Sequence, residues 1–163
     1  MGKEKIVPVK IRGIALDKDT EMPIVILQDR EKQKTMTITI GPFEASAIII
    51  EMEGICPPRP LTHDIITQLF SVHKFTLNSL EIYGTRGDKY LSRIRYSKGL
   101  KKYSMEIRPS DGIALALRLG AEIFAASGLL ENGEKTPEYL QRNSGYSPEL
   151  LYLDAENLDS SLM

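Results

Sequence analysis

Apolar and polar residues alternate along the first forty residues of the chain. Residues 6–16 and 23–28 are rich in β-branched side chains. Residues 35–40 place a methionine and two isoleucines on one face and three threonines on the other. Such alternation is typical of strands with one buried face. We therefore predict three strands, joined by polar turns.

Two helices are predicted next, separated by a proline-rich link. Pro42 suits the first position of a helix that runs to about Met52 and ends at Gly54. Thr62 is a good N-cap for a second helix, which continues to about Lys74. The prolines between the two helices are expected to keep the link extended.

The second half of the sequence repeats this order of elements. Its predicted strands and helix, followed by a last short strand, are residues 76–83, 90–97, 101–107, 109–119 and 122–126. The helix is apolar almost all round, so we expect it to be buried.

The two halves also match at their strand-to-helix junctions. Pro42-Phe43-Glu44 aligns with Pro109-Ser110-Asp111, and each triplet follows a predicted strand. This indicates a β-β-β-α pseudo-repeat, although any such junction favours a proline followed by an acid. Both interpretations predict an α+β fold, with about six to seven strands in a largely antiparallel or mixed sheet packed by three main helices.

Length and composition place these elements in one domain with a tail. The chain has 163 residues, of which 42% are hydrophobic and 26% charged. We assign residues 1–128 to the domain. Residues 129–163 form a polar, acidic C-terminal tail, with room for a short helix at about 137–142. We predict no membrane span, because no apolar run is long enough to cross a bilayer.

Charge and cysteine content exclude several classes of site. The net charge of −1 gives no general attraction to nucleic acid, so such binding would need a local patch. Cys56 is the one cysteine, which excludes an intrachain disulfide and a multi-thiolate zinc site. A reducing, cytoplasmic location suits this composition.

Three acids and a histidine stand at the predicted helix starts. Glu44, Asp64 and Asp111 each fall in a first turn, and His63 precedes Asp64. Acids there stabilise the helix dipole by about 0.3–1 kcal/mol, which is one explanation. The other is that they supply oxygen ligands to Mg²⁺ or Mn²⁺. The dipole disfavours a charged His63, and a neutral imidazole can act as a base or ligand.

Three arginines, Arg59, Arg108 and Arg118, flank these acids. A guanidinium can grip phosphate with its planar fork. The alternative is a set of salt bridges: Arg108 with Asp111, and Arg118 with an acid of the other half.

The segment 86–102 is strongly basic and has interleaved tyrosines. Its basic residues, against Asp88 alone, are Arg86, Lys89, Arg93, Arg95, Lys98, Lys101 and Lys102. Such a segment suits the backbone and unstacked bases of DNA or RNA. The alternative is a solvated edge hairpin, protected by its lysines from strand pairing.

Three blocks, residues 40–48 (IGPFEASAI), 59–64 (RPLTHD) and 108–116 (RPSDGIALA), resemble the hallmark blocks of the bifunctional nuclease family of bacteria and plants. The resemblance covers about residues 5–126. It implies an α+β domain, a homo-oligomer (with a dimer favoured) and, in some members, nuclease activity on DNA and RNA. The site residues it implies are Glu44, Arg59, His63, Asp64, Arg108 and Asp111. Gly112 departs from the family, which usually has alanine there.

Two hypotheses follow. In the first, the protein is a nuclease that hydrolyses phosphodiester bonds of DNA or RNA: Glu44, Asp64 and Asp111 hold Mg²⁺ or Mn²⁺ and His63 activates water. Arg59 and Arg108 then stabilise charge on the phosphate, and segment 86–102 binds the strand. In the second, the protein is a non-catalytic binding or regulatory module whose acids and arginines are structural. Convergence of the acids and His63 on one point would distinguish them.

Overall fold

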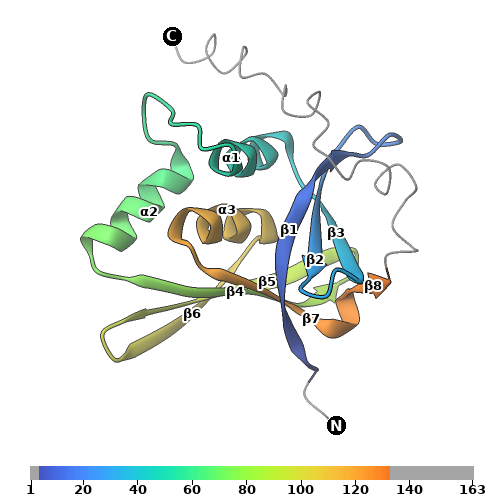
Figure 1. The fold of residues 1–163 in the computed structure, drawn as a ribbon. Helices are drawn as coiled ribbons and strands as arrows, with labels where there is room; N and C mark the ends of the chain where they lie inside the picture. The colour runs from blue at the N-terminus through green and yellow to red at the C-terminus, as the bar shows by residue number, and fades with distance from the viewer. Residues whose placement is uncertain (1–3, 133–163) are drawn as a thin grey trace.

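The computed structural model describes residues 4–132, in which three helices lie together on one side of a curved sheet (Figure 1). In chain order the elements are β1 (Ile6–Leu16), β2 (Pro23–Asp29), β3 (Lys34–Thr39), α1 (Pro42–Met52), α2 (Thr62–Val72), β4 (Thr76–Arg86), β5 (Lys89–Lys98), β6 (Lys101–Ile107), α3 (Pro109–Leu119), β7 (Glu122–Ala126), a short 3₁₀ turn (Ser127–Leu129) and β8 (Glu131–Asn132).

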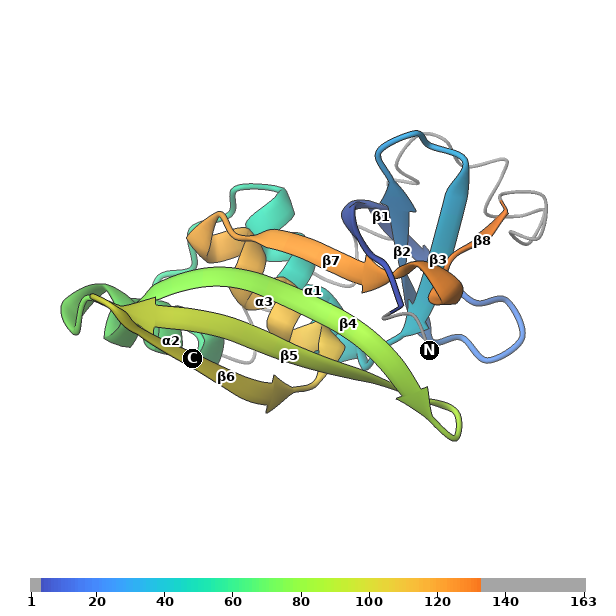
Figure 2. The ribbon, with the colours of Figure 1, turned by 90° about the horizontal axis from the view of Figure 1, so that it is seen from below.

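The sheet confirms the predicted α+β fold and its repeated order of elements. The strands lie in the order β6-β5-β4-β7-β1-β2-β3-β8. Each half is an antiparallel meander followed by a helix, and β7 joins the halves by pairing parallel to β4 and antiparallel to β1. Figure 2 shows β7 between the two meanders, with the helices behind β4 and β5.

The last strand was not predicted from the sequence. β8 pairs with the beginning of β3, and Leu130 just before it is buried. A two-residue strand is too short to give a periodic pattern, so only its pairing with β3 identifies it. The rest of the predicted tail, with its helix at about 137–142, lies outside the described residues.

The core lies between the helices and the sheet. Ile48 of α1, Leu80 and Ile82 of β4, and Ile113 of α3 are each 0% exposed. Helix α3 packs between α1 and α2, and its first two-thirds is largely buried. This confirms the burial predicted from its apolar sequence.

The helix ends follow the predicted chemistry with one correction. Pro42 and Pro109 occupy the beginnings of α1 and α3, and Gly120 ends α3 with a left-handed φ of 66°. The predicted cap Thr62 is wrong: Leu61 is the N-cap of α2, and its side chain cannot accept a hydrogen bond. Instead, the Asp64 carboxylate accepts one from the Leu61 backbone N–H at 2.9 Å.

Apart from the two-residue β8, helix α2 and strand β6 are the least covered elements of the described residues. No residue of α2 is fully buried, and Ile65, Leu69 and Val72 are 51%, 52% and 73% exposed. Strand β6 is the outer strand of its half, and its Met105 is 50% exposed. The position of α2 therefore rests on few apolar contacts.

Gly112 allows α3 to approach β4 closely. A Cβ at this position would overlap Cδ1 of the fully buried Leu80. We predict that Gly112→Ala lowers the free energy of unfolding by about 1 kcal/mol. Overpacking against Leu80 should destabilise the fold by about 1–3 kcal/mol, whereas the higher helix propensity of alanine stabilises it by about 1 kcal/mol. Urea denaturation measures this change. In the double variant with Leu80→Ala, the new methyl group occupies vacated space, so the loss should be smaller than the sum of the single losses; additive losses would contradict the packing explanation.

Candidate functional site

Four of the six predicted site residues, Glu44, His63, Arg108 and Asp111, are joined by contacts near the first turns of the three helices. Glu44 stands in the first turn of α1, and His63 and Asp64 in that of α2. Asp111 stands in the first turn of α3, and Arg108 is the N-cap of that helix. Both α1 and α3 directly follow the last strand of a meander, so the repeat itself brings Glu44 and Asp111 to the same end of the helix layer.

Arg108 lies between two of these carboxylates. Its Nε and Nη2 donate to the two oxygens of Asp111 at 2.7 and 3.2 Å, and its Nη1 donates to Glu44 Oε1 at 3.0 Å. The hydrogen bond and charge of Asp111, together with Glu44, raise the pKa of Arg108. Its side chain is 67% exposed, so solvent still reaches the guanidinium.

Asp111 also holds His63. His63 Nε2 lies 2.9 Å from Asp111 Oδ1, and the two side chains are 14% and 23% exposed. Burial raises the pKa of Asp111, but hydrogen bonds from Arg108 and His63 outweigh it, so the pKa is lowered. An ionised carboxylate can only accept, so the hydrogen in this bond belongs to Nε2. In a neutral His63, Nδ1 is then the nitrogen that can take a proton.

Asp64 is oriented away from this cluster by a different arginine. Its Oδ1 accepts from Arg118 Nε at 2.8 Å, and its Oδ2 is the cap acceptor for Leu61. Burial raises the pKa of Asp64, and the hydrogen bonds from Arg118 and Leu61 more than reverse this, so the pKa is lowered. Both salt bridges suggested by the sequence, Arg108 with Asp111 and Arg118 with an acid of the other half, are present.

The predicted metal ligands Glu44, Asp64 and Asp111 do not converge on one point. Within residues 4–132, no three His, Cys, Asp or Glu side chains are placed to hold one metal ion. A guanidinium stands between Glu44 and Asp111, which places positive charge where a cation would have to bind. This donor set does not fit Mg²⁺ or Mn²⁺ as arranged, and metal dependence stays a prediction.

An open groove of about 690 Å³ reaches the cluster from one side, with Glu44 and Arg108 in its wall. Its other walls are the end of β3, the start of β5 with Tyr90 and Ser92, and the end of β6. Strands β3 and β5 lie far apart in the strand order, so the groove exists because the sheet curls its two ends toward each other. Sequence reasoning missed this groove, since no local pattern reports that curl.

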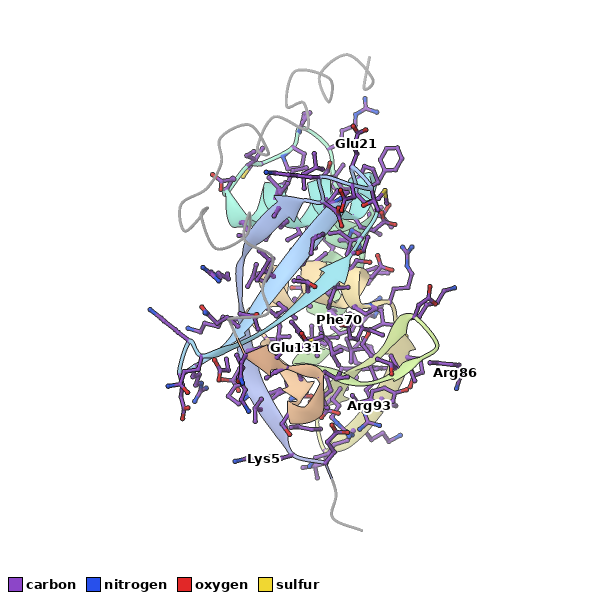
Figure 3. The ribbon with its side chains drawn as sticks, turned by 90° about the vertical axis from the view of Figure 1, so that its right-hand side faces the viewer. Lys5, Glu21, Phe70, Arg86, Arg93 and Glu131 are labelled. Atoms are coloured by element: carbon purple, nitrogen blue, oxygen red, sulfur yellow. The ribbon has the colours of Figure 1, made fainter. Side chains whose placement is uncertain are left out.

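The seven basic residues of segment 86–102 do not form one surface. Arg93 and Arg95 each donate to Glu81, at 2.8 and 2.6 Å, and the Arg93 guanidinium lies 4.7 Å from the centre of the Tyr83 ring. The other five lie near the two ends of β5, about 30 Å apart for a ten-residue strand. Figure 3 shows Arg86 projecting from one end, away from Arg93.

Two further predicted features have structural roles or no partner. Tyr96 packs in an aromatic cluster, with its ring centre 5.6 Å from that of Phe70 and 5.1 Å from that of Tyr103. Arg59 is exposed in the loop between α1 and α2, and no ion pair holds it within the described part of the chain.

Among residues 4–132, no helix is long and apolar enough to cross a membrane. The expected homo-oligomer and cytoplasmic location stay predictions.

The lowered pKa of Asp111 predicts acid sensitivity. Its folded-state pKa lies below its unfolded value, near 3.9, so its contribution is present above that pH and lost as pH falls through the folded value. We expect Asp111→Asn to lower the free energy of unfolding by about 2 kcal/mol at pH 7. The difference from the unaltered protein should shrink as the pH is lowered from about 5 to 2.

Urea denaturation at several pH values measures both quantities. Glu122→Gln is the control, because the Arg30–Glu122 pair is exposed, and this change should alter the free energy of unfolding by less than about 1 kcal/mol. A difference between Asp111→Asn and the unaltered protein that stays constant down to pH 2 would contradict the ionised pair.

Comparison with known proteins agrees with the blocks that form this cluster. The model of the bifunctional nuclease domain matches residues 25–138, a range that includes α1, α2, α3 and every residue of the cluster. Two uncharacterized proteins of Mycobacterium tuberculosis, from strains CDC 1551 / Oshkosh and ATCC 25618 / H37Rv, are each 31% identical over 122 residues, which is 75% of this chain and 73% of theirs. The chain belongs to the bifunctional nuclease domain family.

Proposed function

We propose that the protein is a nuclease that hydrolyses phosphodiester bonds, with His63, Asp111 and Arg108 as its reacting and binding groups. The observation that supports this most is that one carboxylate, Asp111, bonds both the imidazole of His63 and the guanidinium of Arg108. Of these three residues, Arg108 lies in the wall of the open groove. A histidine held by a carboxylate is a common arrangement for proton transfer, and an exposed guanidinium suits phosphate.

In the proposed reaction, His63 acts as general base. Its Nδ1 takes a proton from water as the water oxygen attacks phosphorus, while Asp111 stabilises the imidazolium. The bond from phosphorus to the leaving sugar oxygen breaks, its electron pair stays on that oxygen, and the oxygen takes a proton from solvent. His63 then returns the proton it accepted to solvent. The net change is addition of one water across the phosphodiester.

Arg108 would bind the phosphate. Its bonds to Glu44 and Asp111 use three of its five N–H groups within the described residues, which leaves two for a ligand. Because the guanidinium is mostly exposed, a phosphate can approach it without unfolding the cluster. Glu44 holds Arg108 from the other side and so fixes the direction of the fork.

The alternative function is a non-catalytic binding module. It is favoured because Glu44, Asp64 and Asp111 do not converge on one point within the described residues. Their carboxylates are instead engaged in ion pairs or a backbone bond. Such a module would bind nucleic acid or another phosphate at Arg108 and leave it unchanged.

Replacement of His63 separates these functions. We predict that His63→Ala lowers kcat/KM for cleavage of single-stranded DNA and RNA by about 10²–10⁴-fold, the usual contribution of a general base. His73→Ala is the matched control, because His73 is exposed at the far end of α2. The assay is run with Mg²⁺, with Mn²⁺ and with chelator. Cleavage that survives His63→Ala unchanged would contradict His63 as the general base, and binding without cleavage by the unaltered protein supports the module.

The split of the basic residues predicts which of them bind nucleic acid. Lys89 lines the groove that contains Arg108, whereas Arg95 is already paired with Glu81. We expect Lys89→Ala to reduce the slope of log affinity against log salt concentration by about 0.7–0.9, as for loss of one phosphate contact. Arg95→Ala should leave the slope unchanged. Titration with labelled oligonucleotides at several salt concentrations measures this, and equal slopes for both variants would exclude the groove as the binding surface.

A further inference from the structure

Helix α2 carries His63 but has little to hold its first turn in place. The proline-rich loop 53–61 precedes α2, and no residue of α2 is fully buried. The main apolar contact of α2 lies near the C-terminal end of the helix, at Phe70. The Phe70 ring centre is 5.7 Å from that of Phe75 and 5.6 Å from that of Tyr96. Ile66 also packs against the core, but the apolar residue of the first turn, Ile65, is exposed. We therefore infer that polar contacts fix the first turn.

Two such contacts join the first turn to α3: His63 bonds Asp111 at the start of α3, and Asp64 bonds Arg118 in its last turn. The Arg118 side chain is only 3% exposed. Its Nε donates to Asp64 Oδ1 at 2.8 Å, its Nη1 to the Ala114 carbonyl at 3.0 Å and its Nη2 to the Ala47 carbonyl at 3.1 Å. One buried guanidinium thus joins α1, α2 and α3.

We propose that Arg118 is a positioning residue for the reaction at His63. Through Asp64, the neighbour of His63 in the chain, it fixes the first turn of α2 so that His63 Nε2 lies 2.9 Å from Asp111. This inference rests on the proposed nuclease function for its kinetic consequence, but its structural consequence can be measured without any activity.

The geometry explains why a lysine could not replace Arg118 in these hydrogen bonds. Three acceptors lie around Arg118 in different directions, and a rigid planar fork reaches all of them at once, whereas a lysine ammonium is a single point charge. A buried charge is also tolerated only when it is paired and hydrogen-bonded. Loss of Arg118 is therefore expected to release the first turn of α2, while Phe70 keeps the rest of the helix in place.

The structural test uses the two histidines of the chain, His63 and His73. In Arg118→Met, the imidazole resonances of His63 in NMR spectra should move to those of a ring without a carboxylate partner. Those of His73 should not change, and neither set should change in the control Arg30→Met, at an exposed ion pair. Unchanged His63 resonances in folded Arg118→Met would overturn the proposal.

A second variant serves if Arg118→Met does not fold. Asp64→Asn keeps an oxygen that can accept from Leu61 but removes the charge that holds Arg118, and its site is 26% exposed. It should move the His63 resonances in the same direction by a smaller amount. His63 resonances that stay in place in this variant would overturn the proposal as well.

The kinetic test is cleavage of single-stranded DNA. Arg118→Met should lower kcat by about 10–100-fold, as expected when a reacting group is displaced by about 1 Å, and change KM by less than about threefold. The double variant with Asp64→Asn should be no slower than Arg118→Met alone, because both act through one link. Unchanged kcat in a variant whose His63 resonances have moved would overturn the positioning role. Absence of cleavage by the unaltered protein would instead refute the nuclease function and leave the NMR result to decide the structural link.

Discussion

The rest of the site depends on the ion pairs made by the two arginines at the ends of helix α3. Arg108, at the start of α3, binds Glu44 of α1, and Arg118, at its end, binds Asp64 of α2. The central helix therefore holds the first turns of both its neighbours by charge. Apolar packing secures α1 and α3, but not the beginning of α2, so there the ion pair decides the geometry.

This arrangement separates two kinds of acid that look alike in the sequence. Asp64 bonds a buried arginine and the backbone N–H of its own N-cap, so both of its oxygens are engaged within the fold. Asp111 bonds an exposed arginine and a histidine, so a ligand that binds Arg108 would also change the surroundings of His63. In the proposed reaction, ligand binding and proton transfer would therefore be coupled through one carboxylate, Asp111.

The helices and strands of this site and several of its contacts could be predicted from the sequence, because they depend on patterns of neighbouring residues. Alternation identified the strands, and prolines identified the helix starts at 42 and 109. The cap at Thr62 was wrong because the carboxylate three residues beyond Leu61 does the capping. The spacing of the basic residues in segment 86–102 does not show that some of these charges lie at opposite ends of one strand and that others are paired with Glu81. The groove was missed because it depends on the curl of the whole sheet.

The differences between the two halves are as informative as their match. At the constant offset of the repeat, Gly41 occupies the position of Arg108. A Cβ at Gly41 would overlap the carboxylate of Glu44, so glycine lets Glu44 turn back over the start of α1 to reach Arg108. One arginine thus serves the acids of both halves. His63 comes from α2, which has no counterpart in the repeat. The asymmetry leaves one mostly exposed guanidinium, beside a histidine that only one half supplies. This single position is consistent with the proposal that a ligand binds at Arg108.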